Sequence, residues 1–591
     1  SGYTVPAGLD ISDAAVTQVN YYDSYDCRNM DGFSSLPTAG LSPDAQKVKG
    51  NLAATRTAVF SDIDDNPGPE AYLYALVDYD IEGNVTGTVE STIQPGTTLA
   101  TKYTLSRQGK PLEVRYELHM PDTVYVMNHI RHLDTSGFIS MEKAMPGYES
   151  APEKAPWQFT VDYSYDGLGR LESKTAGAGN RMSYSYNLRG QLKSVTSPVF
   201  TQTLCYEDGG TPCHNGNISA MKVGYGSGNP VNRSFTYDRL NRLSSMTSDD
   251  GFNTAYSYNL NSGPLTITRQ GVLSDGTCGT VDDLTVSYDG NRPVRVTDHA
   301  DPVILEGSLD FAAGEARYSY DSDGRMTSDT GRGIDITYNP VDRPAVISTD
   351  TGTQYRYTYD ATGRKLGSRR IADTPVTAGE DEAMLYIGPF ELKSTGEATA
   401  LHRINLPWGY ITGNGDRMTY VTDYQGNIRA VVDSLGNTVQ TTDYYPYGLP
   451  MTTSAGPAAN PYKYSGKELE TRDGLNLYDF HARQYDPALG LFDRPDPMAI
   501  NYPGLNPYLH CAANPVMNVD PTGKDTWRIN AKGEVVEWID TKEYDRFEFI
   551  DDDGNILVNS DGEEQRLQFK YGTVVRHRKL SYPEFTRFNG T

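Results

Sequence analysis

Aromatic and polar residues alternate over short stretches that recur along the middle of the chain. In "YSYDGLGRLESK", which begins at Tyr163, two tyrosines stand two residues apart with a serine between them. Side chains two apart on a strand lie on the same face, so this alternation predicts a strand with one buried face. The polar and glycine residues that follow predict a turn, and "RLESK" predicts the return strand.

The same strand-turn-strand unit recurs, and several copies are separated by about 21 residues. The other copies are "YSYNLRGQLKSV" from Tyr184, "FTYDRLNRLSSM" from Phe235, "YSYNLNSGPLTI" from Tyr256, "VSYDGNRPVRVT" from Val286, "YSYDSDGRMTSD" from Tyr318, "ITYNPVDRPAVI" from Ile336 and "YTYDATGRKLGS" from Tyr357. One hairpin cannot bury its own rings, so the period predicts an array in which each hairpin stacks on its neighbours.

The turn residues have a physical role in each unit. Asp166 can accept hydrogen bonds from backbone NH groups two residues on, and Gly169 can adopt the positive φ that closes the loop. In several units an arginine then begins the return strand: Arg170, Arg242, Arg325 and Arg364. Two interpretations of the repeated Tyr and Arg side chains remain open here: cross-strand packing with cation-π contacts, or a sugar-binding platform.

Composition narrows the class of protein. The chain has 591 residues, 43 of them Tyr and only 16 Phe, so tyrosine must supply much of the buried area. A net charge of -25 argues against a body that binds nucleic acid by neutralising phosphates. No apolar run approaches the length of a membrane span. The opening "SGYTVPAGLD" has no signal-like leader and is typical of a mature or trimmed chain.

Five cysteines are too few for a disulfide scaffold. Cys205 and Cys213 either close a small hairpin as a disulfide or pack unpaired, and the sequence favours neither. No CxxC or HxxxH spacing indicates a metal, so neither a metal nor another cofactor is expected. Residues 43–60, "PDAQKVKGNLAATRTAVF", are the one stretch with a weak helical pattern.

The pattern xYxYDxxGRL resembles the YD repeats of the RHS family, whose relatives include the C subunits of bacterial Tc toxins and the teneurins. The resemblance implies an all-β protein in which the hairpins form one continuous spiralling sheet around a hollow shell. Residues 151–463 would form that shell. Residues 1–150 carry degenerate copies, and "NYYDSYD" is similar to RHS proteins of Bacteroidetes; this region would be either the first shell turns or a small capping β domain.

Residues 464–523 resemble the RHS repeat-associated core domain along their whole length. In that family the segment is a plug inside the shell and an intramolecular aspartic peptidase. The resemblance places the two catalytic carboxylates at Asp496 and Asp520 and the family's arginine at Arg483, with the cut near Gly523 and Lys524. Two close carboxylates share a proton, so one can activate water while the other acts as the acid.

Three departures from the family pattern keep a second interpretation open. The first motif reads "DPMA", with Ala499 where the family has glycine, and Leu491 replaces the arginine of "GRF". The spacing from Asp496 to Asp520 is also slightly longer than in the family motif. Asp-Pro is also an ordinary way to open a turn, so Asp496 and Asp520 are either catalytic or only turn-forming.

The tail, residues 524–591, has no YD unit and is rich in short strand patterns. Its position is where RHS proteins carry a variable toxin, and it would be either a complete small domain or the start of a longer one. The sequence indicates no toxin chemistry there. His577, in "RHRK", is interpreted as part of a solvated basic strand end.

These features predict a secreted or cell-surface shell that encloses and delivers its own C-terminal segment. The resemblance implies a secretion machine and an immunity protein as further partners, with no nucleic acid bound by the shell. The alternative is a surface adhesion or carbohydrate-binding protein without toxin activity. A protease-protected tail would favour the first function, and glycan affinity retained after tail removal would favour the second.

Overall fold

The computed structural model describes residues 17–37, 47–60, 71–148, 158–177, 179–209, 211–300, 309, 311, 314–372, 382–395, 398–456, 460–524, 527–529, 535–538, 544–548 and 566–570. Within this part of the chain there is no α-helix, only five short 3-10 turns among many strands. None of its helical turns is long and apolar enough to cross a membrane.

Thirty-three strands of the described residues form one sheet. The first half comprises β1 (Gln18–Tyr22), β2 (Leu52–Phe60), β3 (Ala71–Tyr79), β4 (Val85–Ser91), β5 (Thr98–Leu105), β6 (Pro111–Met120), β7 (Thr123–Leu133), β8 (Ile139–Tyr148), β9 (Phe159–Tyr165), β10 (Leu171–Ala176), β11 (Asn180–Tyr186), β12 (Leu192–Thr196), β13 (Phe200–Cys205), β14 (Ala220–Tyr225), β15 (Val231–Tyr237), β16 (Leu243–Ser248) and β17 (Thr254–Tyr258). The second half comprises β18 (Pro264–Val272), β19 (Cys278–Asp289), β20 (Arg292–Asp298), β21 (Gly314–Tyr320), β22 (Met326–Asp329), β23 (Ile334–Tyr338), β24 (Pro344–Thr349), β25 (Gln354–Asp360), β26 (Lys365–Ile371), β27 (Glu382–Ile387), β28 (Phe390–Thr395), β29 (Ala398–Leu406), β30 (Gly409–Thr412), β31 (Arg417–Thr422), β32 (Ile428–Val432) and β33 (Thr438–Thr441).

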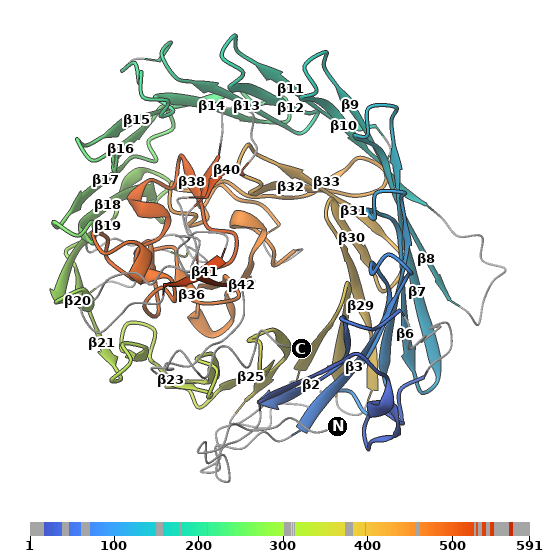
Figure 1. Ribbon diagram of the computed structural model, residues 1–591. Coiled ribbons are helices and arrows are strands. Elements are labelled where there is room, and N and C mark those ends of the chain that lie inside the picture. Colours follow the sequence, from blue (N-terminus) through green and yellow to red (C-terminus); the bar gives the residue numbers. More distant parts are fainter. Residues whose placement is uncertain are drawn as a thin grey trace, which may run out of the picture.

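Each strand of this sheet pairs antiparallel with the next strand in the sequence. The sheet closes on itself because β2 also pairs with β25, through Val59 opposite Asp360 and Phe60 opposite Tyr359. Strands β26 to β33 then continue past the closure. Figure 1 shows the result as a ring of strands around an interior, so the predicted all-β spiralling shell is confirmed.

The hairpin turns have the predicted chemistry. Asp166 Oδ1 accepts hydrogen bonds from the backbone nitrogens of Leu168 and Arg170, at 2.9 and 3.0 Å. Gly169 has φ +74°. Most of these hairpins also contain a register shift just before the turn, for example between Ser185 and Tyr186, and such bulges increase the twist that curves a sheet.

In most YD units the second tyrosine ties its hairpin to the preceding one. Its hydroxyl donates to a backbone carbonyl at the start of the preceding return strand, at 2.6 to 3.0 Å. The pairs are Tyr165–Ile139, Tyr186–Leu171, Tyr206–Leu192, Tyr237–Ile218, Tyr258–Leu243, Tyr288–Pro264, Tyr320–Pro293 and Tyr338–Met326.

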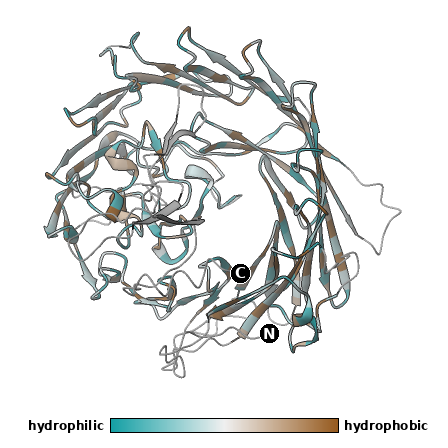
Figure 2. Ribbon diagram, in the orientation of Figure 1, coloured by the Kyte–Doolittle hydropathy of each residue, from teal (hydrophilic) through white to brown (hydrophobic). Residues whose placement is uncertain are grey.

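Arginines add a second link between hairpins. Arg170 lies over the ring of Tyr186 at 4.5 Å, and Arg242 lies over the ring of Tyr258 at 4.9 Å. The repeated Tyr and Arg side chains are therefore packing elements of the wall. Hydrophobic and hydrophilic positions are interspersed along that wall (Figure 2), as expected for strands with one face covered.

A second, small sheet lies inside the ring, at the position of β36 in Figure 1. It consists of β34 (Glu468–Glu470), β35 (Leu477–Asp479), β36 (Gln484–Asp486) and β37 (Leu491–Phe492), with 3-10 turns η2 (Tyr464–Gly466), η3 (Arg472–Gly474), η4 (Ala499–Asn501) and η5 (Cys511–Ala513) around it. This inner segment is the predicted C-terminal plug. The remaining 3-10 turn, η1 (Asp26–Asn29), lies near the first strands.

The plug is bound to the wall by charged and backbone contacts. Lys365 of β26 forms ion pairs with Glu468 at 2.7 Å and Asp479 at 2.6 Å. Arg269 of β18 donates to the carbonyl of Ala488 at 2.7 Å. Apolar plug residues share one core cluster with wall residues. Wall and plug therefore pack together as a single body where these residues meet.

The structure decides two further points, the pairing of Cys205 with Cys213 and the helical pattern near the N-terminus. All five cysteines are free, so Cys205 and Cys213 do not form a disulfide. The weak helical pattern over residues 43–60 predicted a helical turn. This prediction was wrong for residues 52–60, which form β2 between β1 and β3. Neighbouring strands decide the conformation of that segment. Residues 43–46 lie outside the described residues.

Part of the tail continues from the plug as strands. Strand β38 (Asn518–Val519) pairs with β39 (Trp527–Ile529), which pairs with β40 (Val535–Trp538). Strands β41 (Tyr544–Glu548) and β42 (Arg566–Lys570) form a separate pair. His577 lies outside the described residues.

Candidate active site

Arg483 lies directly before β36, in a tight turn that follows β35. The nitrogen of Phe480 donates to the carbonyl of Arg483 at 3.0 Å, which closes the turn. His481 within this turn has φ +67°. The Arg483 side chain is 1% exposed, and its guanidinium lies 3.6 Å from the centre of the Phe492 ring. The turn and the aromatic ring together fix the direction of the guanidinium.

The guanidinium brings together all the residues that the sequence nominates. Its Nη2 contacts Asp496 Oδ2 at 2.8 Å and Asp520 Oδ2 at 3.3 Å. Its Nε donates to the carbonyl of Gly523 at 2.5 Å. The two carboxylates therefore share one nitrogen, while the same side chain contacts the peptide bond that joins Gly523 to Lys524.

Each aspartate also forms the turn that its Asp-Pro sequence predicts. Asp496 Oδ1 accepts a hydrogen bond from the nitrogen of Met498 at 2.8 Å. Asp520 Oδ1 accepts from the nitrogens of Thr522 at 3.2 Å and Gly523 at 2.7 Å. One oxygen of each carboxylate thus supports a turn and the other faces Arg483. Turn formation therefore accounts for one oxygen of each carboxylate, and the contact with Arg483 accounts for the other.

The backbone requires glycine at the end of the second Asp-Pro motif but not at the end of the first. Gly523 has φ +72°, and a Cβ added there would lie 2.8 Å from the carbonyl oxygen of Phe480. Ala499 belongs to the 3-10 turn η4 and does not have a positive φ. Alanine in the first motif is therefore compatible with its backbone. Leu491, another departure from the family pattern, is a buried residue of β37.

Sequence reasoning missed Lys467, which is 54 residues away from the segment it contacts. Its Nζ donates to the carbonyl of Pro521 at 2.6 Å, inside the second motif. Burial lowers the pKa of Lys467, and the negative charges of Asp479 and Asp520 oppose that shift. No local pattern around "SGKELE" signals this contact, because only the folded plug brings the two segments together.

No model of a known protein family matches the chain. The chain is 26% identical over 387 residues to the tRNA3(Ser)-specific nuclease WapA of Bacillus spizizenii, across 63% of this chain and 15% of that protein. It is 30% identical over 265 residues to the toxin subunit YenC1 of Yersinia entomophaga, across 41% of this chain and 26% of that protein.

A solved structure, TcdB2-TccC3-Cdc42, has the same fold, with a TM-score of 0.52 at 15% identity over 86% of this chain and 30% of that chain. Sequence matches and fold agree with the tandem YD hairpins. The chain is an RHS-type YD-repeat protein. This RHS chain spans less than a third of the length of each of these three proteins.

A histidine-cysteine pair lies beside the Arg483 cluster of this RHS protein. His510 Nε2 is 3.1 Å from Cys511 Sγ, and both side chains are buried. Burial, helped by the charge of Arg483, lowers the pKa of His510 to about 3. Burial also raises the pKa of Cys511 well above its usual value. Neither group is suited to act as a base-nucleophile pair.

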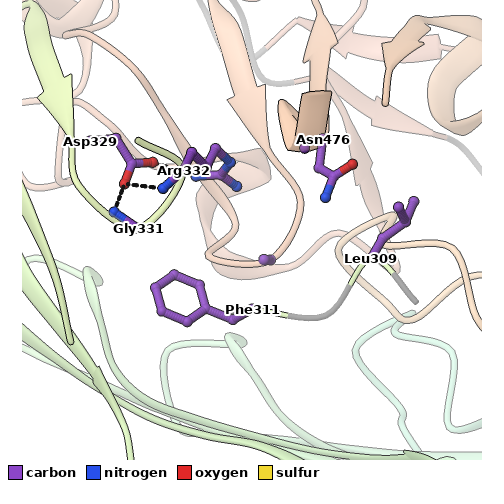
Figure 3. Close-up of a pocket in the computed structure, with 8 residues that line it drawn as sticks. Leu309, Phe311, Asp329, Gly331, Arg332 and Asn476 are labelled. Carbon is purple, nitrogen blue, oxygen red and sulfur yellow. Dashed lines mark hydrogen bonds and ion pairs between the residues drawn. The ribbon is translucent and has the colours of Figure 1, made fainter. Parts of the chain in front are cut away.

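The RHS shell also contains a cavity of about 240 Å³ between wall and plug, shown in Figure 3. Asp329 and Arg332 line it and form an ion pair at 2.7 Å, and Arg332 also contacts Asp486 at 2.9 Å. The charged side chains that line the cavity therefore form ion pairs with neighbouring protein groups. The cavity shares no lining residue with the Arg483 cluster.

Proposed function

We propose that this RHS shell encloses the segment that follows Gly523 and that the Arg483 cluster releases it by cutting the chain after Gly523. The observation that carries the proposal is the contact of Arg483 Nε with the Gly523 carbonyl at 2.5 Å. The same guanidinium contacts Asp496 and Asp520. A charged donor on a carbonyl next to two carboxylates is suited to peptide hydrolysis.

The chemistry would proceed as follows. Arg483 polarises the Gly523 carbonyl and stabilises the negative charge that develops on its oxygen. One of Asp496 and Asp520 takes a proton from a water molecule, whose oxygen adds to the carbonyl carbon. The other gives a proton to the leaving nitrogen of Lys524 as the carbon-nitrogen bond breaks. The products are a carboxylate at Gly523 and an amine at Lys524.

Several features support enclosure of the tail. The plug lies within the ring, and β39 pairs with β38 of the plug, so the chain enters the tail from inside the shell. Relatives of the chain are named as a nuclease and a toxin subunit. In this proposal residues 1–150 and 151–463 form the wall, 464–523 the plug and 524–591 the cargo. The protein would act outside its producer, which would need an immunity protein.

Denaturing mass analysis of the wild-type chain beside Asp520→Asn tests the cut. The wild type is expected to separate into a large body ending at Gly523 and a small tail beginning at Lys524. The variant is expected to remain one chain, because the amide side chain of asparagine cannot exchange a proton as a carboxylate does. Two uncut proteins would contradict self-cleavage, and a cut that persists in the variant would indicate an outside protease.

The uncut Asp520→Asn chain also distinguishes enclosure from the adhesion alternative. Limited proteolysis of the folded protein should leave residues after Lys524 intact until the shell is unfolded with denaturant. Digestion of the tail while the wall stays intact, together with glycan binding by the wall, would favour an adhesion protein.

A further inference from the structure

Three successive carbonyls before the proposed cut are each held by a different donor. The Pro521 carbonyl accepts from Lys467 Nζ at 2.6 Å, and the Thr522 carbonyl accepts from the nitrogen of Ala482 at 3.2 Å. The Gly523 carbonyl accepts from Arg483 Nε at 2.5 Å. Residues 521–523 are therefore bound as a substrate peptide is bound in a cleft, with backbone contacts along its length.

The position of Lys467 is itself fixed by the plug. Its backbone nitrogen donates to the Tyr464 carbonyl at 2.9 Å, and its own carbonyl accepts from the nitrogen of Lys463 at 2.9 Å. The residue is 8% exposed, and its Nζ lies 5.7 Å from the centre of the Phe480 ring. A buried ammonium group is costly unless it is hydrogen-bonded, so the Pro521 carbonyl stabilises it.

We propose that Lys467 is a positioning residue for the cut, which it serves by holding Pro521 so that the Gly523 carbonyl stays against Arg483. The proposal rests on the proposed function of the Arg483 cluster. Lys467 contacts a carbonyl two residues before the cut peptide bond, so it does not touch the reacting atoms.

Fixing Pro521 should matter because the neighbouring contact is weak. The hydrogen bond from Ala482 to Thr522 is long, at 3.2 Å, and Arg483 also contacts two carboxylates and the carbonyl of Pro507. Without Lys467 the segment would rotate about Pro521, and small displacements of a reacting carbonyl cost large factors in rate.

The test follows the cut over time in full-length chains made by cell-free translation and analysed on denaturing gels. Lys467→Met is expected to slow the cut by about tenfold or more, the effect of losing one hydrogen bond from a charged donor. Lys467→Arg should restore most of the rate, because a guanidinium can still donate to the Pro521 carbonyl. Failure of Lys467→Arg to restore any rate would contradict a positioning role.

Lys463→Met is the matched control. Lys463 is also buried, at 3% exposed, but its Nζ donates to the carbonyl of Asn460 at 3.0 Å rather than to the cut segment. The control is expected to be cut at nearly the wild-type rate. Equal slowing by Lys463→Met and Lys467→Met would show a general loss of stability and overturn the assignment.

Hydrogen exchange separates this inference from the proposed function. In an Asp496→Asn chain, or in the wild type if that proves uncut, Lys467→Met should speed amide exchange across residues 522–524 without changing exchange in the wall. Unchanged exchange there would overturn the positioning role whether or not any chain is cut. A wild type that is never cut, with faster exchange in Lys467→Met, would refute only the proposed function.

Discussion

The tyrosine that ends most YD strands makes two separate kinds of contact with its surroundings. Its ring packs among neighbouring rings and arginines, while its hydroxyl donates to the preceding hairpin. At Tyr288 the hydroxyl donates to the Pro264 carbonyl at 2.8 Å. Burial raises the pKa of Tyr288, so the hydroxyl remains a donor at all ordinary pH values. This explains why the repeat uses tyrosine where phenylalanine would supply the same apolar area.

Replacing Tyr288 by Phe should lower the free energy of unfolding by about 1 kcal/mol, because the Pro264 carbonyl loses its donor while the ring is kept. Denaturant unfolding measures the change. Tyr22→Phe is the control, since Tyr22 is 52% exposed, and it should have almost no effect. Equal effects of the two changes would contradict the role of the hydroxyl.

At the scale of the element, the turn between β9 and β10 holds its two glycines, Gly167 and Gly169, in different backbone conformations. Gly169 has φ +74°, and a Cβ there would lie 3.0 Å from the Phe138 ring of the preceding hairpin. Gly167, two residues earlier in the same turn, has no positive φ and nothing within 4 Å of such a Cβ. Only the second glycine is required by the backbone.

Gly169→Ala should therefore destabilise the wall by about 1 to 2 kcal/mol, the cost of a left-handed conformation at a residue with a side chain. Gly167→Ala should be neutral to within about 0.5 kcal/mol. Thermal unfolding of both variants beside the wild type measures the difference. A larger loss in Gly167→Ala than in Gly169→Ala would contradict this account of the turn.

The hairpins could be predicted from the sequence because their determinants are local. Asp166, Gly169 and the alternating tyrosines act within a few residues of one another. The closure of the ring could not be predicted in this way, since Val59 and Asp360 pair across about three hundred residues and neither carries a distinctive pattern. The family resemblance nominated Arg483, Asp496 and Asp520 as candidate site residues. The contact of Lys467 with Pro521 became visible only in the folded plug.

At the scale of the whole molecule, one buried carboxylate joins distant parts of the wall. Asp443, just after β33, contacts Arg233 of β15 at 2.5 Å and Arg429 of β32 at 2.6 Å. Burial alone would raise the pKa of Asp443, but the two arginines outweigh it and lower the pKa to about 2. The folded value lies below the usual value of 3.8, so ionised Asp443 stabilises the fold.

That stabilisation should be fully present above about pH 4 and be lost as the pH falls toward 2. Asp443→Asn should cost about 3 kcal/mol or more at neutral pH, because it removes the carboxylate that two buried arginines share. The gap between wild type and variant should then narrow between about pH 4 and pH 2. Unfolding measured across this range, with exposed Asp335→Asn as control, tests the sign; a constant gap would contradict it.

The order of the strands has a consequence for synthesis on the ribosome. Every wall strand pairs with the strand translated just before or just after it. The wall can therefore assemble from its N-terminal end while the polypeptide is still growing. The ring can close once Asp360 has emerged, well before residues 464–524 are made. The residues after Gly523 are translated later than every wall strand, so the ring can be closed before they leave the ribosome.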